Sequence, residues 1–111
     1  MLRRTDRTME RYMKAGAKMR LFKTLGARMI TDISAVLSAQ DQDKLMRAMD
    51  KIGEVCSHAE DNMFRDHPEL SNNYVDVFYG STDGGPRNDV DRRVLEMARE
   101  AADELFEGER Y

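Results

Sequence analysis

The stretch AQDQDKLMRAMDKIGEVCSHAEDNMFRD, residues 39–66, has the pattern of one long amphipathic helix. Its apolar residues recur at steps of three and four, so they share one stripe of a helix with about 3.6 residues per turn. Ser38 before the stretch and Asp41 three residues later resemble a capping box, and Pro68 ends the helix. The stripe must be buried against other elements. Its members are Leu45, Ala48, Met49, Ile52, Val55, Cys56, Ala59 and Met63.

The preceding residues predict a second long helix over 6–37, with Thr5 or Asp6 as its N-cap. From Phe22 onward its apolar residues lie on the side that basic residues occupy before. The helix therefore either ends at Gly26 or continues and contacts different neighbours at its two ends. We favour one continuous helix, because a single interior glycine costs only about 1 kcal/mol. The short link at Ser38 then forces an antiparallel hairpin.

The rest of the chain predicts two further helices. Residues 69–79 favour a short helix, with a single strand as the alternative, and the loop GSTDGGPRN follows. Residues 89–107 carry the stripe of a last helix that Gly108 ends. Residues 1–111 are thus expected to form a single all-α domain. Its architecture would be an antiparallel long-helix hairpin with a short third helix and a C-terminal helix, a three- to four-helix bundle.

Composition limits the class of protein. The chain has 111 residues, of which 41% are hydrophobic and 35% charged, with a single cysteine. Cys56 lies on an apolar stripe, which favours a small buried side chain, and one cysteine excludes an internal disulfide. There is no apolar run of about 20 residues and no secretory signal, so we expect no membrane partner and a cytoplasmic location.

Charge is divided unevenly along the chain. Residues 1–28 hold nine bases and two acids, a net charge of +7, so the remainder carries −10 of the total of −3. Five of these bases step by three and four along one helical face and could bind phosphate groups. Alternatively the stripe is solvated, or it pairs with the acidic last helix. Its members are Arg4, Arg7, Arg11, Lys14 and Lys18.

No pattern in the sequence defines a catalytic or metal site. A row of Asp50, Glu54, His58 and Asp61 shares one helix face, but a salt-bridged surface explains it better than a metal centre. There is no nucleophile motif and no phosphate-binding loop. We therefore expect no enzyme activity and no cofactor.

The leading functional interpretation is a small protein–protein interaction module, an adaptor or an inhibitor of a larger partner. A helix over residues 7–37 would extend ~46 Å, beyond a compact body of this size, and would leave an apolar N-terminal face open. A homodimer or another protein would cover that face, which consists of Met9, Tyr12, Met13, Gly16 and Met19.

Two alternative functions involve nucleic acids. The first is an accessory protein that binds nucleic acid through the basic stripe of residues 4–18. The second is an inhibitor that mimics nucleic acid through the acidic residues of the last helix. Those residues are Glu100, Asp103, Glu104, Glu107 and Glu109.

Overall fold

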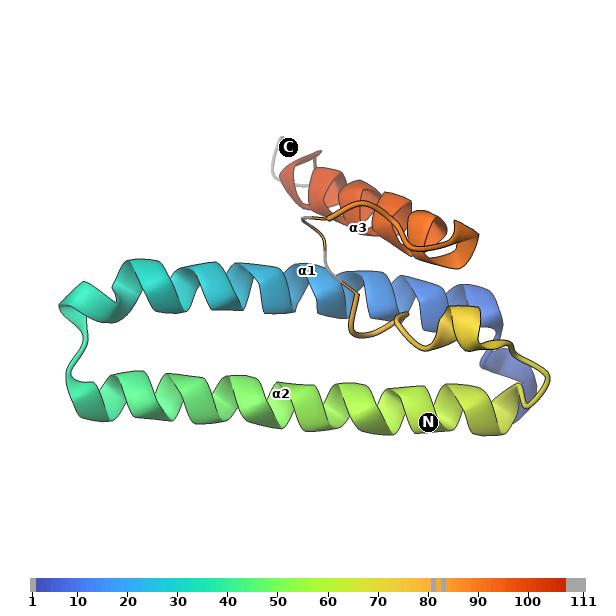
Figure 1. The fold of residues 1–111 in the computed structure, drawn as a ribbon, viewed down its shortest axis with the longest axis horizontal. Helices are drawn as coiled ribbons and strands as arrows, with labels where there is room; N and C mark the ends of the chain where they lie inside the picture. The colour runs from blue at the N-terminus through green and yellow to red at the C-terminus, as the bar shows by residue number, and fades with distance from the viewer. Residues whose placement is uncertain (1, 81, 83, 108–111) are drawn as a thin grey trace.

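The computed structural model describes residues 2–80, 82 and 84–107 and contains three α-helices (Figure 1). These are α1 (Met9–Ile33), α2 (Ala39–Asp66) and α3 (Asp89–Glu107). Three short 3-10 turns accompany them, η1 (Arg4–Asp6), η2 (Ser34–Val36) and η3 (Asn72–Tyr74), and the described residues include no strand. The predicted all-α class is confirmed, and the architecture is a three-helix bundle.

Helix α1 is the central element of the bundle. Helix α2 returns antiparallel along one side of α1, and α3 packs on another side (Figure 1). The segment that joins α2 to α3 crosses in front of α1 in this view. The two long helices give the molecule extents of 47 × 33 × 30 Å.

Local sequence signals place the helix ends. The Ser38 hydroxyl accepts a hydrogen bond from the Asp41 backbone N–H at 3.1 Å, so the predicted cap of α2 is confirmed. Helix α1 begins later than predicted, because Thr8 is its N-cap and Thr5 and Asp6 lie in η1. Gly108, the predicted end of the last helix, lies outside the described residues.

Helix α1 is continuous through Gly26, as predicted. The end of the Met49 side chain of α2 occupies the space that a Cβ atom at Gly26 would take, so the glycine leaves room for that side chain. At its C-terminal end, however, α1 stops at Ile33, and residues 34–36 turn as η2.

The predicted short helix over residues 69–79 is wrong. The structure has only η3 there, followed by turns through Tyr79. Two adjacent asparagines and two valines disfavour helix locally. The backbone carbonyls that would be paired within a helix instead accept hydrogen bonds from side chains of α1. Arg20 donates to the carbonyls of Asp76 and Val77, and Lys23 donates to that of Phe78.

The core lies at the end of the hairpin where α1 begins and α2 ends. Cys56 and Met63 of α2 are fully buried there, together with Val77 and Phe78 of the joining segment and Val94 of α3. Toward the η2 end, α2 faces α1 alone. Two predicted members of the α2 stripe, Ala48 and Val55, are exposed, whereas the next residues, Met49 and Cys56, are half-buried and buried.

Candidate functional site

The apolar N-terminal face that we expected to bind a partner is covered within the chain. Tyr12 and Gly16 are buried, and Met9, Met13 and Met19 pack against the core. A Cβ atom at Gly16 would lie 2.6 Å from both the Cγ1 atom and the carbonyl oxygen of Val77. The glycine thus accommodates the joining segment, not a second helix, and the expectation that this face is open to water is wrong.

The predicted phosphate-binding stripe is divided by the fold. Arg7 makes a two-point ion pair with Asp66, with Nε–Oδ2 at 2.5 Å and Nη2–Oδ1 at 3.0 Å. Arg4 donates to the backbone carbonyl of the same aspartate. Arg11, Lys14 and Lys18 are exposed, and Lys14 lies 3.9 Å from Glu10. Two of the five bases therefore join the segment before α1 to the end of α2.

A compact polar cluster surrounds Asp66. The Tyr12 hydroxyl donates to Asp66 Oδ2 at 2.5 Å, and the His67 ring packs edge-on against Tyr12 with centroids 5.9 Å apart. Hydrogen bonds from Arg7 and Tyr12 hold the pKa of Asp66 well below its usual range. Burial, then the hydrogen bond to Asp66, raises the pKa of Tyr12. A saturated carboxylate and a weakly acidic phenol are suited to fastening the hairpin, not to proton transfer.

The Asp66 carboxylate makes stability depend on pH. Its pKa is depressed in the folded state and about 4 in the unfolded chain, so its contribution is fully present above pH ~4 and is lost as pH falls through the folded value. We expect Asp66→Asn to have a lower free energy of unfolding than wild type at pH 6. The difference between the two should be smaller at pH 3. Urea melts at both pH values measure this difference, and Asp61→Asn, at an exposed residue, is the control. A difference of equal size at pH 6 and pH 3 would contradict the expectation.

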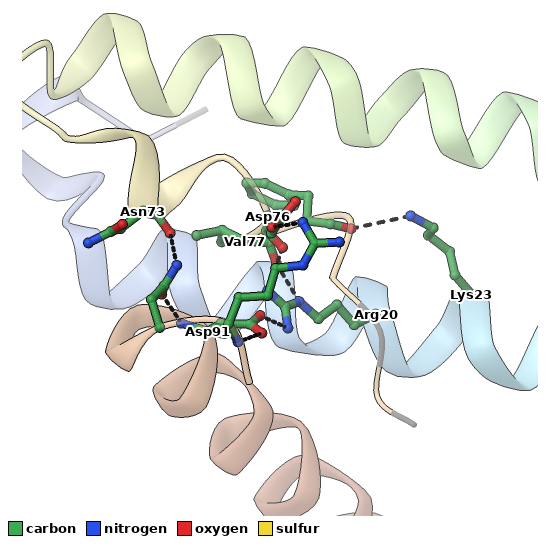
Figure 2. Close-up of polar contacts among 9 residues, drawn as sticks. Arg20, Lys23, Asn73, Asp76, Val77 and Asp91 are labelled. Carbon is green, nitrogen blue, oxygen red and sulfur yellow. Dashed lines mark hydrogen bonds and ion pairs between the residues drawn. The ribbon is translucent and has the colours of Figure 1, made fainter. Parts of the chain in front are cut away.

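Arg20 is a buried cation that the sequence analysis did not single out. Only 1% of the residue is exposed, and its Nη1 lies 2.6 Å from Asp91 Oδ1 of α3 (Figure 2). Its Nε donates to the Val77 carbonyl at 2.9 Å. Gly80 leaves room for the guanidinium, because any side chain there would overlap it. One side chain of α1 thus holds both the joining segment and α3.

A sequence signal for this pair does exist. Arg20 lies outside the basic stripe and four residues after Gly16, on the apolar side of α1. Asp91 likewise lies three residues before Val94 and seven before Ala98, on the apolar stripe of α3. Opposite charges on two stripes that must both be buried indicate an ion pair between the helices.

The face of α1 that stays exposed is the one opposite the joining segment. Nine residues are two and a half helical turns of about 3.6 residues, so Leu25 lies opposite Gly16, and Met29 lies opposite Arg20. Phe22 and Leu25 are 52% and 64% exposed, and Met29 is exposed as well. We call this the open face of α1. It consists of Arg11, Lys14, Lys18, Phe22, Leu25 and Met29.

A groove runs along the apolar half of the open face, where α3 ends against α1. It has a volume of about 400 Å³. Phe22 and Leu25 line it from α1 and Leu105 lines it from α3. The charged residues Lys18 and Glu104 line it as well. Leu105 and the neighbouring Phe106 are also exposed. The lining of the groove therefore combines apolar side chains with charges of both signs.

Three other possibilities concern Cys56, a metal centre and a membrane-spanning helix. Cys56 is buried, as predicted, and burial raises the pKa of its thiol. Among the residues that the structure describes, no group of three or more His, Cys, Asp or Glu side chains could hold a metal ion. No described helix is both long and apolar enough to cross a membrane.

The comparisons with known proteins give no relative. No protein-family model matches the chain, and neither a curated protein nor a solved structure does. The surface of this three-helix bundle is therefore the feature that bears on function.

Proposed function

We propose that this protein is a small non-catalytic interaction module, an adaptor or inhibitor, that binds a protein partner through the open face of α1. The observation that carries the proposal is the row of large apolar side chains at Phe22, Leu25 and Met29, continued by Leu105 of α3. Contiguous exposed apolar side chains with a polar rim are typical of protein-binding surfaces. The proposal keeps α1 as the binding element and moves the contact to the face opposite the predicted one.

The polar clusters support a role without chemistry. Asp66 is saturated by donors from Arg7 and Tyr12, and Arg20 is committed to Asp91 and to backbone carbonyls. These groups connect elements of the fold. Arg7 and Tyr12 also line a pocket of about 300 Å³, but both are already hydrogen-bonded to Asp66.

The alternative of nucleic-acid binding has narrower support. Arg11, Lys14 and Lys18 remain exposed in a row and could follow a phosphate backbone. However, Arg4 and Arg7 are engaged with Asp66, and Glu10 lies beside Lys14. Three bases give little counterion release, so affinity for nucleic acid would be low.

The alternative of nucleic-acid mimicry is also weaker than the main proposal. Glu100 lies 3.8 Å from Arg93 of its own helix, and Glu104 shares a groove with Lys18 of α1. These neighbours reduce the negative potential that a mimic of phosphate needs. Asp103 and Glu107 remain exposed, and Glu109 lies outside the described residues.

An affinity-capture experiment tests the main proposal. The tagged full chain, a Phe22→Glu variant and a Met46→Glu variant would be incubated with lysate of the native cell, with and without nuclease. Met46 on α2 is 55% exposed, close to the value for Phe22, so it is a matched control. We expect a protein partner, which includes further copies of this chain, to be retained by wild type and Met46→Glu and lost with Phe22→Glu.

Circular dichroism would verify that both variants remain helical. Retention of the same proteins by all three forms would reject the open face as the binding surface. Loss of all retained protein on nuclease treatment would favour the nucleic-acid alternative.

A further inference from the structure

We propose that the partner of the open face is a second copy of this chain, bound in an antiparallel two-fold dimer centred on Leu25. This inference rests on the proposed function and names its partner. It follows from the spacing, the symmetry and the charges of five exposed residues of α1.

The spacing is that of a seam between two paired helices. Lys18, Phe22, Leu25, Met29 and Asp32 follow one another at steps of four, three, four and three, and all five are exposed. Such alternation keeps side chains on one line along a helix and is typical of two-helix contacts. The three central positions are large and apolar, and the two outer positions are charged.

The seam is complementary to itself when one copy is reversed. A two-fold axis at Leu25 places the two Leu25 side chains against each other, and it brings each Phe22 to within one residue, ~1.5 Å along the helix, of Met29 of the second copy. The same axis places Lys18 opposite the second copy's Asp32 at both ends. An isologous contact of this kind uses the same surface twice, as two-fold dimers require. The contact would therefore consist of a central Leu25 layer, a layer of Phe22 and Met29 on each side of it, and an ion pair of Lys18 and Asp32 at each end.

The charges also select the direction of pairing. A parallel pair would place Lys18 against Lys18 and Asp32 against Asp32, which repel. Polar residues within an apolar seam are known to fix register and orientation in paired helices. The antiparallel arrangement is thus favoured because it pairs opposite charges and because the parallel arrangement would pair like charges.

The end of α3 extends the contact beyond α1. Leu105 lines the groove beside Phe22 and Leu25, so a helix seated on the seam would also cover Leu105. From residue 18 to residue 32 the seam is ~21 Å long at ~1.5 Å per residue. Such a contact is at the small end of specific interfaces, and we expect a dimer with a dissociation constant in the micromolar range, on the order of 10 μM.

Sedimentation of the full chain over a wide concentration range tests the dimer. We expect a reversible monomer–dimer equilibrium for wild type. Leu25→Glu should weaken it roughly tenfold or more, because it buries two carboxylates against each other. Val55→Glu is the matched control, because Val55 is 56% exposed on α2, outside the seam, and the dissociation constant should not change.

A charge exchange tests the register. Lys18→Asp and Asp32→Lys should each weaken the dimer, because each places like charges together at both ends. The double variant restores opposite charges in the same places and should return the dissociation constant to near the wild-type value. Restoration is expected only if Lys18 and Asp32 pair across the interface, because separate structural effects of the two substitutions would add and weaken the dimer further.

The outcomes separate this inference from the proposed function. A wild-type chain that is monomeric up to several hundred micromolar overturns the dimer; the proposed function then survives if Phe22→Glu still abolishes capture of a different protein. A dimer insensitive to Leu25→Glu, or not restored by the charge exchange, overturns the antiparallel seam.

Discussion

Replacement of Arg20 by alanine is expected to lower the free energy of unfolding by about 3–5 kcal/mol, the usual cost of breaking one partner out of a buried ion pair. The guanidinium is fully enclosed and contacts Asp91 at 2.6 Å. Its removal would leave the Asp91 carboxylate buried without its cation and the Val77 carbonyl without its donor. Denaturant melts followed by circular dichroism measure the change.

Two further variants make this test specific. Arg11→Ala removes an exposed arginine from the same helix and should change stability by less than ~0.5 kcal/mol. Arg20→Met combined with Asp91→Leu removes both charges and should recover part of the loss. Recovery should be incomplete, because methionine cannot donate to the carbonyls of Asp76 and Val77. A loss below ~1 kcal/mol for Arg20→Ala would show that the pair contributes little.

The helices were predictable because their signals are local. A stripe with helical period and a serine cap require only neighbouring residues, and both located α2 within one residue of its ends. The prediction that α1 continues through Gly26 rested on the small cost of one interior glycine, which is also a local property. The pairing of α1 with α2 followed from the short link at Ser38.

The contacts of α1 were not predictable in the same way. The helix has apolar residues on opposite faces of its two halves, and periodicity cannot say which face a distant segment will cover. The joining segment covers the face with Gly16 because Gly16 admits the Val77 backbone and Arg20 binds its carbonyls. The predicted partner face is therefore part of the core, and the face with Leu25 stays open.

The joining segment itself shows why the short helix was mispredicted. Its dense apolar residues suggested a packed element, which is correct, since Val77 and Phe78 are fully buried. A buried segment need not be helical when side chains of another helix satisfy its backbone carbonyls. Arg20 and Lys23 supply those donors from 55 or more residues away in sequence, and no local pattern can indicate so distant a contact.

Phe78→Ala is expected to destabilise the fold by about 3–5 kcal/mol, because it removes a fully buried aromatic side chain and leaves a cavity. Phe78 is 1% exposed and belongs to the cluster that includes Cys56, Met63 and Val94, so it joins the segment to two helices. Phe106→Ala is the matched control: the same atoms are removed from a side chain that is 69% exposed, and we expect a change below ~0.5 kcal/mol. Urea melts of the two variants and wild type at pH 7 give the difference. If both variants changed the free energy of unfolding equally little, the joining segment would not be part of the cooperative core. The face of α1 opposite that segment would then not be identified as the open face.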